Sequence, residues 1–118
     1  FKLPIMKAIK VANYNDIKSS QQYNDVSDFL LFDAKPPMIG KNSLPGGNGI
    51  SFDWALLRSA KINKPWFLSG GIHVGNVQEA IKITKSKSID ISSGVEDQPG
   101  VKNVQKIEVF MKYLKEVM

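Results

Sequence analysis

The sequence contains no cysteine and a single histidine, His73, among its 118 residues. Without thiols, this chain holds no disulfide, no thiolate metal site and no thiol nucleophile. A lone histidine also argues against a metal centre, because such centres usually take several ligands from side chains of this kind. We therefore expect a site without a metal ion.

Long apolar runs are also missing. No uninterrupted apolar stretch approaches the ~18 residues that a membrane-spanning helix needs, so we expect no membrane partner. The first residues, from Phe1 to Pro4, do not resemble a signal peptide, which favours a cytoplasmic location. The sequence starts without methionine, and this predicts that an upstream segment has been lost.

Positive charge is in mild excess but is not concentrated in one segment. Sixteen Lys and Arg residues against eleven acids give a net charge of +5, and no block of about five like charges is present. We infer a weak attraction for anionic ligands and no nucleic-acid partner. A chain of 118 residues, 42% of them hydrophobic, is expected to form one domain over residues 1–118.

Strand and helix patterns alternate along the chain. Apolar runs at residues 29–32 and 65–69, a mostly apolar segment interrupted by lysines at 5–11 and the segment at 89–93 predict strands, and helical patterns follow each of them. Such alternation is typical of a parallel α/β sheet with right-handed crossovers. We predict half of a (β/α)8 TIM barrel, a (βα)4 half-barrel with parallel strands; a small open sheet is the rival interpretation.

Two helices allow more detailed predictions. Asn76 and Glu79 have the spacing of a capping arrangement at the start of the third helix. For the C-terminal helix, the three-and-four spacing predicts an apolar face made of Val104, Ile107, Met111, Leu114 and Met118. Trp54 and Trp66 are predicted to be core residues between helix and sheet.

Small and polar residues follow the predicted strands, where parallel α/β proteins bind their ligands. Asp33 ends the second strand, where desolvation can raise the pKa of a carboxyl group toward that of a general acid; a helix cap or a partner for Lys35 are the alternatives. Gly70 and Gly71 follow the third strand and Ser93-Gly94 the fourth, which favours a backbone phosphate site over plain tight turns.

Other polar residues near these ends are less informative. His73 is interpreted as a surface residue. Asp90 and Glu96 flank the last strand end, where either could hydrogen-bond a ligand hydroxyl, although Glu96 could equally be solvated. Between the second strand and the next helix, residues 34–50 are rich in proline and glycine and form a long loop of the kind that is usually functional or disordered.

Several motifs occur together and in order along the whole chain. They are Leu44-Pro45-Gly46-Gly47-Asn48-Gly49, Phe52-Asp53-Trp54, Leu68-Ser69-Gly70-Gly71 with Asn76-Val77, Asp90-Ile91-Ser92-Ser93-Gly94-Val95-Glu96 and Pro99-Gly100-Val101-Lys102. With these motifs the sequence resembles the phosphoribosylanthranilate isomerase family of tryptophan, and hence aromatic amino acid, biosynthesis, from strand five to helix eight of its barrel.

The resemblance implies an isomerase without cofactor that converts phosphoribosylanthranilate to carboxyphenylamino-deoxyribulose phosphate by an Amadori rearrangement. It implies that Asp33 is the general acid and that Gly46, Gly47 and Gly49 lie in a mobile loop that closes over the substrate. Further phosphate and substrate contacts are implied for Gly70, Gly71, Ser93 and Gly94, with Asp90 inside the same motif but without an assigned step.

One part of the family pattern is missing. The family's general base is a cysteine on strand one, and the sequence has no cysteine. The resemblance therefore implies a C-terminal fragment whose partner is an N-terminal half-barrel. The alternative is a non-catalytic half-barrel that binds phosphate or pairs with a second copy of itself, since exposed strand edges favour pairing.

Overall fold

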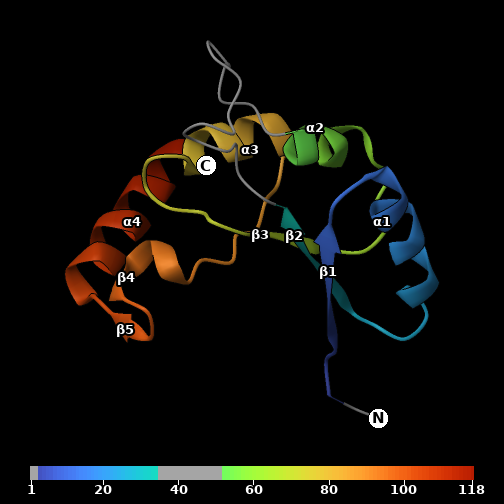
Figure 1. The fold of residues 1–118 in the computed structure, drawn as a ribbon, viewed down its shortest axis with the longest axis horizontal. Coiled ribbons are helices and arrows are strands. Elements are labelled where there is room, and N and C mark those ends of the chain that lie inside the picture. The colour runs from blue at the N-terminus through green and yellow to red at the C-terminus, as the bar shows by residue number, and fades with distance from the viewer. Residues whose placement is uncertain (1–2, 35–51) are drawn as a thin grey trace.

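The computed structural model describes residues 3–34 and 52–118. Its centre is a parallel sheet of strands β1 (Met6–Val11), β2 (Phe29–Ala34) and β3 (Trp66–Ser69), which lie side by side in chain order. The helices form an arc around these strands (Figure 1). The parallel α/β class is thus confirmed, as are the first three predicted strands.

In the described part of the chain, four α-helices make up that arc. They are α1 (Tyr14–Ser19), which continues into the 3-10 helix η1 (Ser20–Tyr23), α2 (Phe52–Ser59), α3 (Val77–Thr84) and α4 (Val104–Val117). In Figure 1, α1 lies at one flank of the sheet and α4 at the other. Within residues 3–34 and 52–118, no helix is both long and apolar enough to cross a bilayer.

The sheet has one helix-covered face. Side chains alternate along parallel strands, so in-register partners share a face. Leu30, Phe32 and Leu68 are almost completely buried on the face that carries the helices. They form one core cluster with Trp54 of α2 and with Ile17 of α1. Burial of these apolar side chains is the main stabilising contribution to the fold.

The opposite face is much less covered by the described residues. It carries Phe29 and Phe67, whose rings meet edge to face at 6.2 Å between centroids, and both are only half-buried. On the neighbouring strand Met6 is 42% exposed. This face is apolar along most of the strands and is only partly covered by the described residues. At the carboxyl ends of the strands it carries three polar residues, Lys10, Asp33 and Ser69.

The prediction of a fourth strand at residues 89–93 was wrong. Ile89 forms only an isolated parallel bridge with Leu68. The ladder ends there because β3 ends at Ser69. Gly70, with a φ of 104°, then turns the chain away from the sheet, so Ile91 has no strand residue to pair with among those described. Residues Ser93–Val95 instead form the short 3-10 helix η2.

An antiparallel hairpin follows η2. Its strands are β4 (Glu96–Gln98) and β5 (Val101–Lys102), and Gly100 between them has a φ of 83°. The sequence reasoning missed it, although Pro-Gly at the two central positions is the usual signal of a type II turn.

Two helix predictions also need correction. Asn76 precedes α3 but makes no side-chain cap hydrogen bond, because its amide oxygen accepts from the His73 N–H at 2.8 Å instead. In α4 the buried residue is Phe110, with Tyr113 and Leu114 packed against the core. Of the predicted apolar face, Val104, Ile107, Met111 and Met118 are exposed.

Candidate functional site

Asp33 lies at the carboxyl end of β2, on the half-open face of the sheet. It is in register with Ser69 of β3 and with Lys10 of β1, and its side chain is half-buried. One carboxylate oxygen, Oδ1, and the Ala34 carbonyl occupy the space that a Cβ on Gly70 would need. Asp33 and the glycine turn after β3 are therefore in direct contact.

The loop that begins at Gly70 is shaped by two residues with left-handed backbone. Gly70 has a φ of 104° and Gly71 a φ of 63°, which only glycine adopts readily. The Asn76 side chain then braces the loop: its amide nitrogen donates to the Gly71 carbonyl at 2.9 Å, while its oxygen accepts from His73 N–H. This bracing role replaces the predicted helix cap.

The turn at Gly94 packs against the same loop. A Cβ on Gly94 would overlap the Ile72 carbonyl and would lie 3.0 Å from the Cα of His73. Glycine is thus required here by a close approach of two backbone segments of the chain itself. Ser93, beside it, is exposed at the surface of η2.

Asp90 joins the site through β3. The Ser69 hydroxyl donates to Asp90 Oδ2 at 2.9 Å, and Ser69 is the in-register neighbour of Asp33. The structure therefore brings together Asp33, Gly70 and Asp90, with Gly71 and Gly94 on the two adjoining turns. The predicted residues Gly46, Gly47 and Gly49 lie outside the described residues.

This arrangement combines an acid with exposed backbone. A half-buried carboxyl group can donate or accept a proton, and glycine turns allow an anionic group to approach main-chain N–H donors closely. Among the described residues, no group of three or more His, Asp or Glu side chains could hold a metal ion. The site as described is suited to acid–base chemistry on a small anionic ligand.

The hairpin after η2 supplies residues that the sequence reasoning did not assign. Lys102 forms an ion pair with Glu96 and also donates to Ser92, to its hydroxyl at 3.1 Å and its carbonyl at 3.3 Å. The hydrogen bond from Lys102 holds the pKa of the Glu96 carboxyl below its usual value. Glu96 is thus engaged by a cation, and no ligand is needed to explain it.

Asp97 is held in a similar way by the first turn of α4. The Asn103 side-chain amide donates to both Asp97 carboxylate oxygens at 3.0 Å, and this lowers the pKa of Asp97, with a further contribution from Lys106. Asn103 also caps α4, because its oxygen accepts from the Lys106 N–H at 2.9 Å.

Residues predicted to be structural behave as expected. His73 is exposed, and its Nδ1 accepts from the Gly75 N–H at 3.0 Å. Trp54 is completely buried, and Trp66 packs edge to face on Phe32 at 5.6 Å.

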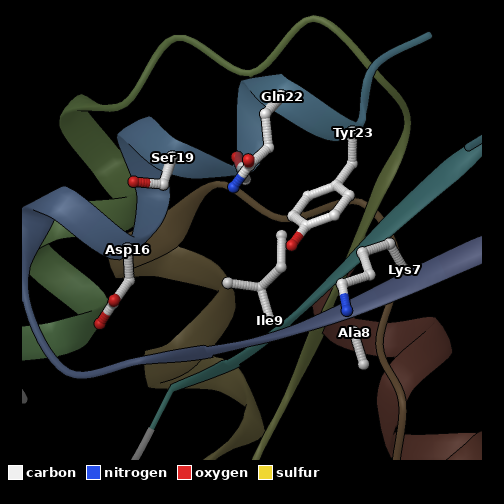
Figure 2. A pocket seen from close by; sticks show the side chains of 8 residues that line it. Lys7, Ala8, Ile9, Asp16, Ser19, Gln22 and Tyr23 are labelled. Atoms are coloured by element: carbon white, nitrogen blue, oxygen red, sulfur yellow. The ribbon is translucent and has the colours of Figure 1, made fainter. Parts of the chain in front are cut away.

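Two cavities lie away from the site. One of about 250 Å³ opens between β1 and α1, where Lys7 and Ile9 point toward Tyr23 while Ala8 points to the other side of the strand (Figure 2). Lys7 stacks over the Tyr23 ring at 4.9 Å. A second cavity of about 460 Å³ lies between α3 and the end of α4. Neither is lined by Asp33 or the glycine turns.

Comparison with protein families gives a match over nearly the whole chain. A model of the family described as "N-(5'phosphoribosyl)anthranilate (PRA) isomerase" matches residues 1–113. The chain is 47% identical over 113 residues to the N-(5'-phosphoribosyl)anthranilate isomerase of Parvibaculum lavamentivorans. That alignment covers 96% of this chain but 53% of the relative, so the chain spans about half the length of the curated relatives it matches.

Solved structures of the same family share the fold. The phosphoribosyl anthranilate isomerase from Thermotoga maritima superimposes with a TM-score of 0.74 at 31% identity, covering 98% of this chain and 53% of that one. A phosphoribosyl anthranilate isomerase solved in complex with reduced 1-(o-carboxyphenylamino)-1-deoxyribulose 5-phosphate gives 0.71 at 29% identity, with 98% and 50% covered.

Proposed function

Because the chain belongs to the N-(5'-phosphoribosyl)anthranilate isomerase family of tryptophan biosynthesis, we propose that it supplies the general acid and the phosphate-binding turns of that isomerase. The observation that carries the proposal is the contact between Asp33 Oδ1 and Gly70, beside the loop against which Gly94 packs. The proposed substrate carries a reacting sugar and a phosphate. Asp33 is the candidate acid for the sugar, and the main chain of the nearby glycine turns is the candidate site for the phosphate.

In this proposal residues 1–118 are the C-terminal (βα)4 half of a TIM barrel, and an amino-terminal half-barrel is the partner. Two observations support it: the chain spans about half the length of its relatives, and apolar side chains are exposed at both flanks. These are Leu3, Ile5 and Met6 near β1, and Val104, Ile107 and Met111 on α4. A second half would cover such residues and continue the sheet beyond β1.

The reaction that we propose is the one that the family resemblance implies. Asp33 protonates the furanose ring oxygen of phosphoribosylanthranilate, the ring opens to a Schiff base, and a general base removes the C2′ proton to give an enolamine that tautomerises to the ketone. The chain has no cysteine for the base, so we place the base on the amino-terminal half.

The remaining predicted contacts complete the substrate site. Main-chain N–H groups near Gly70, Gly71, Ser93 and Gly94 hold the phosphate, and the segment containing Gly46, Gly47 and Gly49 covers the substrate. Asp90, held by Ser69, faces the substrate without an assigned step. The absence of a cofactor and the cytoplasmic location stay predictions.

The decisive experiment combines this chain with the amino-terminal half of the Parvibaculum lavamentivorans relative. We expect turnover of phosphoribosylanthranilate by the mixture and by neither half alone. Asp33→Asn, which keeps the shape of the side chain but removes the acid, is expected to lower kcat by about 10³-fold. The matched control is Asp25→Asn on the exposed loop before β2, which should leave kcat unchanged.

Two results would contradict the proposal. Turnover by the isolated chain would show that the base is not on a partner, and full activity of Asp33→Asn would remove its role as acid. If no mixture is active but the isolated chain binds phosphate esters or forms a stable dimer in light scattering, the chain is the non-catalytic half-barrel.

A further inference from the structure

Lys102 connects the β4–β5 hairpin to the turn that carries Gly94. Its ammonium group donates to the Ser92 hydroxyl at 3.1 Å and to the Ser92 carbonyl at 3.3 Å, and it forms an ion pair with Glu96. Ser92 precedes η2 and Glu96 follows it, so the Lys102 side chain connects the two ends of this 3-10 helix. Hydrogen bonds with an ionised donor are stronger than neutral ones.

The turn has few other bonds to hold its shape. Residues Ser93–Val95 form a short 3-10 helix held by two backbone hydrogen bonds: the Val95 N–H donates to the Ser92 carbonyl at 3.2 Å, and the Glu96 N–H donates to the Ser93 carbonyl. Ser92 makes no side-chain cap. Short 3-10 segments have poor hydrogen-bond geometry and are weak by themselves. On the far side, the Asn103 N–H donates to the Val95 carbonyl at 2.8 Å, which fixes only the end of the turn.

The position of this turn matters at the site because Gly94 has no freedom to move inward. It already abuts the Ile72 carbonyl and His73, on the loop that starts at Gly70. Any outward displacement of Ser92 would separate the two glycine turns. The Lys102 contacts to Ser92 oppose that displacement, and Glu96 keeps the ammonium group beside the turn.

We propose that Lys102 is a positioning residue that holds the Ser92–Gly94 turn in its phosphate-binding form; this rests on the proposed function. Lys102 acts here through the Ser92 hydroxyl and carbonyl, while Glu96 compensates its charge. Loss of the side chain should therefore weaken substrate binding more than it slows the chemical step at Asp33.

Lys102→Met is the test, in the chain combined with the amino-terminal half of the Parvibaculum lavamentivorans relative. We expect KM for phosphoribosylanthranilate to rise about tenfold while kcat changes by less than about twofold, because ground-state binding is lost and the acid is untouched. Lys102→Arg keeps a cationic donor and should recover most of the KM.

Lys106→Met is the matched control. Lys106 lies in α4 and also contacts the hairpin: its Nζ donates to the Glu96 carbonyl at 2.9 Å and lies 3.4 Å from Asp97 Oδ1. Within the residues that the structure describes, and unlike Lys102, it makes no hydrogen bond to Ser92. We expect its KM to stay within about twofold of the wild type. Should Lys102→Met fail to fold, Ser92→Ala removes one of the same contacts and should raise KM by about threefold.

The inference and the proposed function fail in different ways. An inactive wild-type mixture would contradict the proposed function. An active wild-type mixture whose KM does not change in Lys102→Met, or rises equally in Lys106→Met, would overturn only the role of Lys102.

Discussion

The two faces of the sheet differ in how completely they are packed. On the helix side, Phe32 and Leu68 have no exposed surface. On the other side, Phe29 and Phe67 contact each other but are only half-buried, and Asp33 shares their face. The first face carries the buried core of this chain, whereas the second is less buried and carries the candidate site residue Asp33. We infer that the residues that stabilise the chain and the residues of the candidate site lie on opposite faces of the same sheet.

The largest test of this comparison is a pair of matched truncations. Phe32→Ala should lower the free energy of unfolding by about 4 kcal/mol, since it leaves a cavity in a closed core. Phe67→Ala should cost only about 2 kcal/mol in the isolated chain, because part of the side chain is already exposed to water. Urea unfolding measures both, and equal losses would show that the two faces are equally packed.

A second pair separates crowding at the site from backbone strain. Gly70 and Gly100 both have positive φ, but a Cβ at Gly100 would have nothing within 4 Å, while at Gly70 it would overlap Asp33 and Ala34. Gly100→Ala should cost about 1 kcal/mol, and Gly70→Ala about 3 kcal/mol together with most of the turnover. Thermal unfolding measures the loss of stability, and the complementation assay measures the loss of turnover. Similar losses in Gly70→Ala and Gly100→Ala would mean that contact with Asp33 does not restrict the residue at position 70.

Charged side chains at the two flanks should weaken the proposed association between this chain and the amino-terminal half-barrel. Met6→Lys and Ile107→Lys place a cation where we expect the amino-terminal half to pack, and each should weaken association of the halves by about tenfold. Titration of one half into the other measures this. Val26→Lys, at an exposed apolar residue before β2, should have no effect, and neither flank variant should change the stability of the isolated chain by more than about 0.5 kcal/mol.

The smallest expected effect concerns the hairpin and pH. Lys102 holds the pKa of Glu96 below its ordinary value, so the folded state favours the carboxylate. Its contribution to stability is complete above the unfolded pKa and is lost as the pH falls through the folded one. Wild type should therefore lose more stability than Glu96→Gln between about pH 5 and pH 3, as seen in urea midpoints; parallel curves would contradict this.

The local patterns in the sequence were sufficient for most of the architecture. Apolar runs predicted β2 and β3, and a mostly apolar segment interrupted by lysines predicted β1. Ile89 and Ile91 suggested a further strand at residues 89–93, but a ladder also needs a partner strand, and the turn at Gly70 removes it. Strand pairing depends on where the neighbouring strand ends, which a single run does not encode.

Helix faces show a similar limit. In α4, two adjacent stripes are apolar, one through Ile107 and Met111 and one through Phe110 and Leu114. Periodicity is compatible with both, and only packing of α4 against α3 and the core cluster selects Phe110 for burial. Residues that act through side-chain hydrogen bonds, such as Asn76 and Lys102, were beyond sequence reasoning because their partners are set by the loop geometry.

For the candidate site, sequence reasoning gave the residue types and the structure added their proximity. Asp33, Gly70 and Gly94 were predicted to lie together because parallel strands end at the same edge. The structure places Gly70 against Asp33, and it places Gly94 against Ile72 and His73 on the loop that follows Gly70. Their chemical roles stay predictions. The contact between Ser69 and Asp90 could not be foreseen, because it depends on the register of β3 beside a segment that does not form a strand.

Strand β1 has practical consequences for preparing this protein. Among the described residues it pairs only with β2, so one row of its peptide groups faces outward beside Met6. Unpaired N–H and C=O groups at a sheet edge can pair with a strand of another chain and so promote aggregation. Overproduction of residues 1–118 by themselves should yield inclusion bodies, while synthesis from one transcript with the complementing half should keep the product in the supernatant.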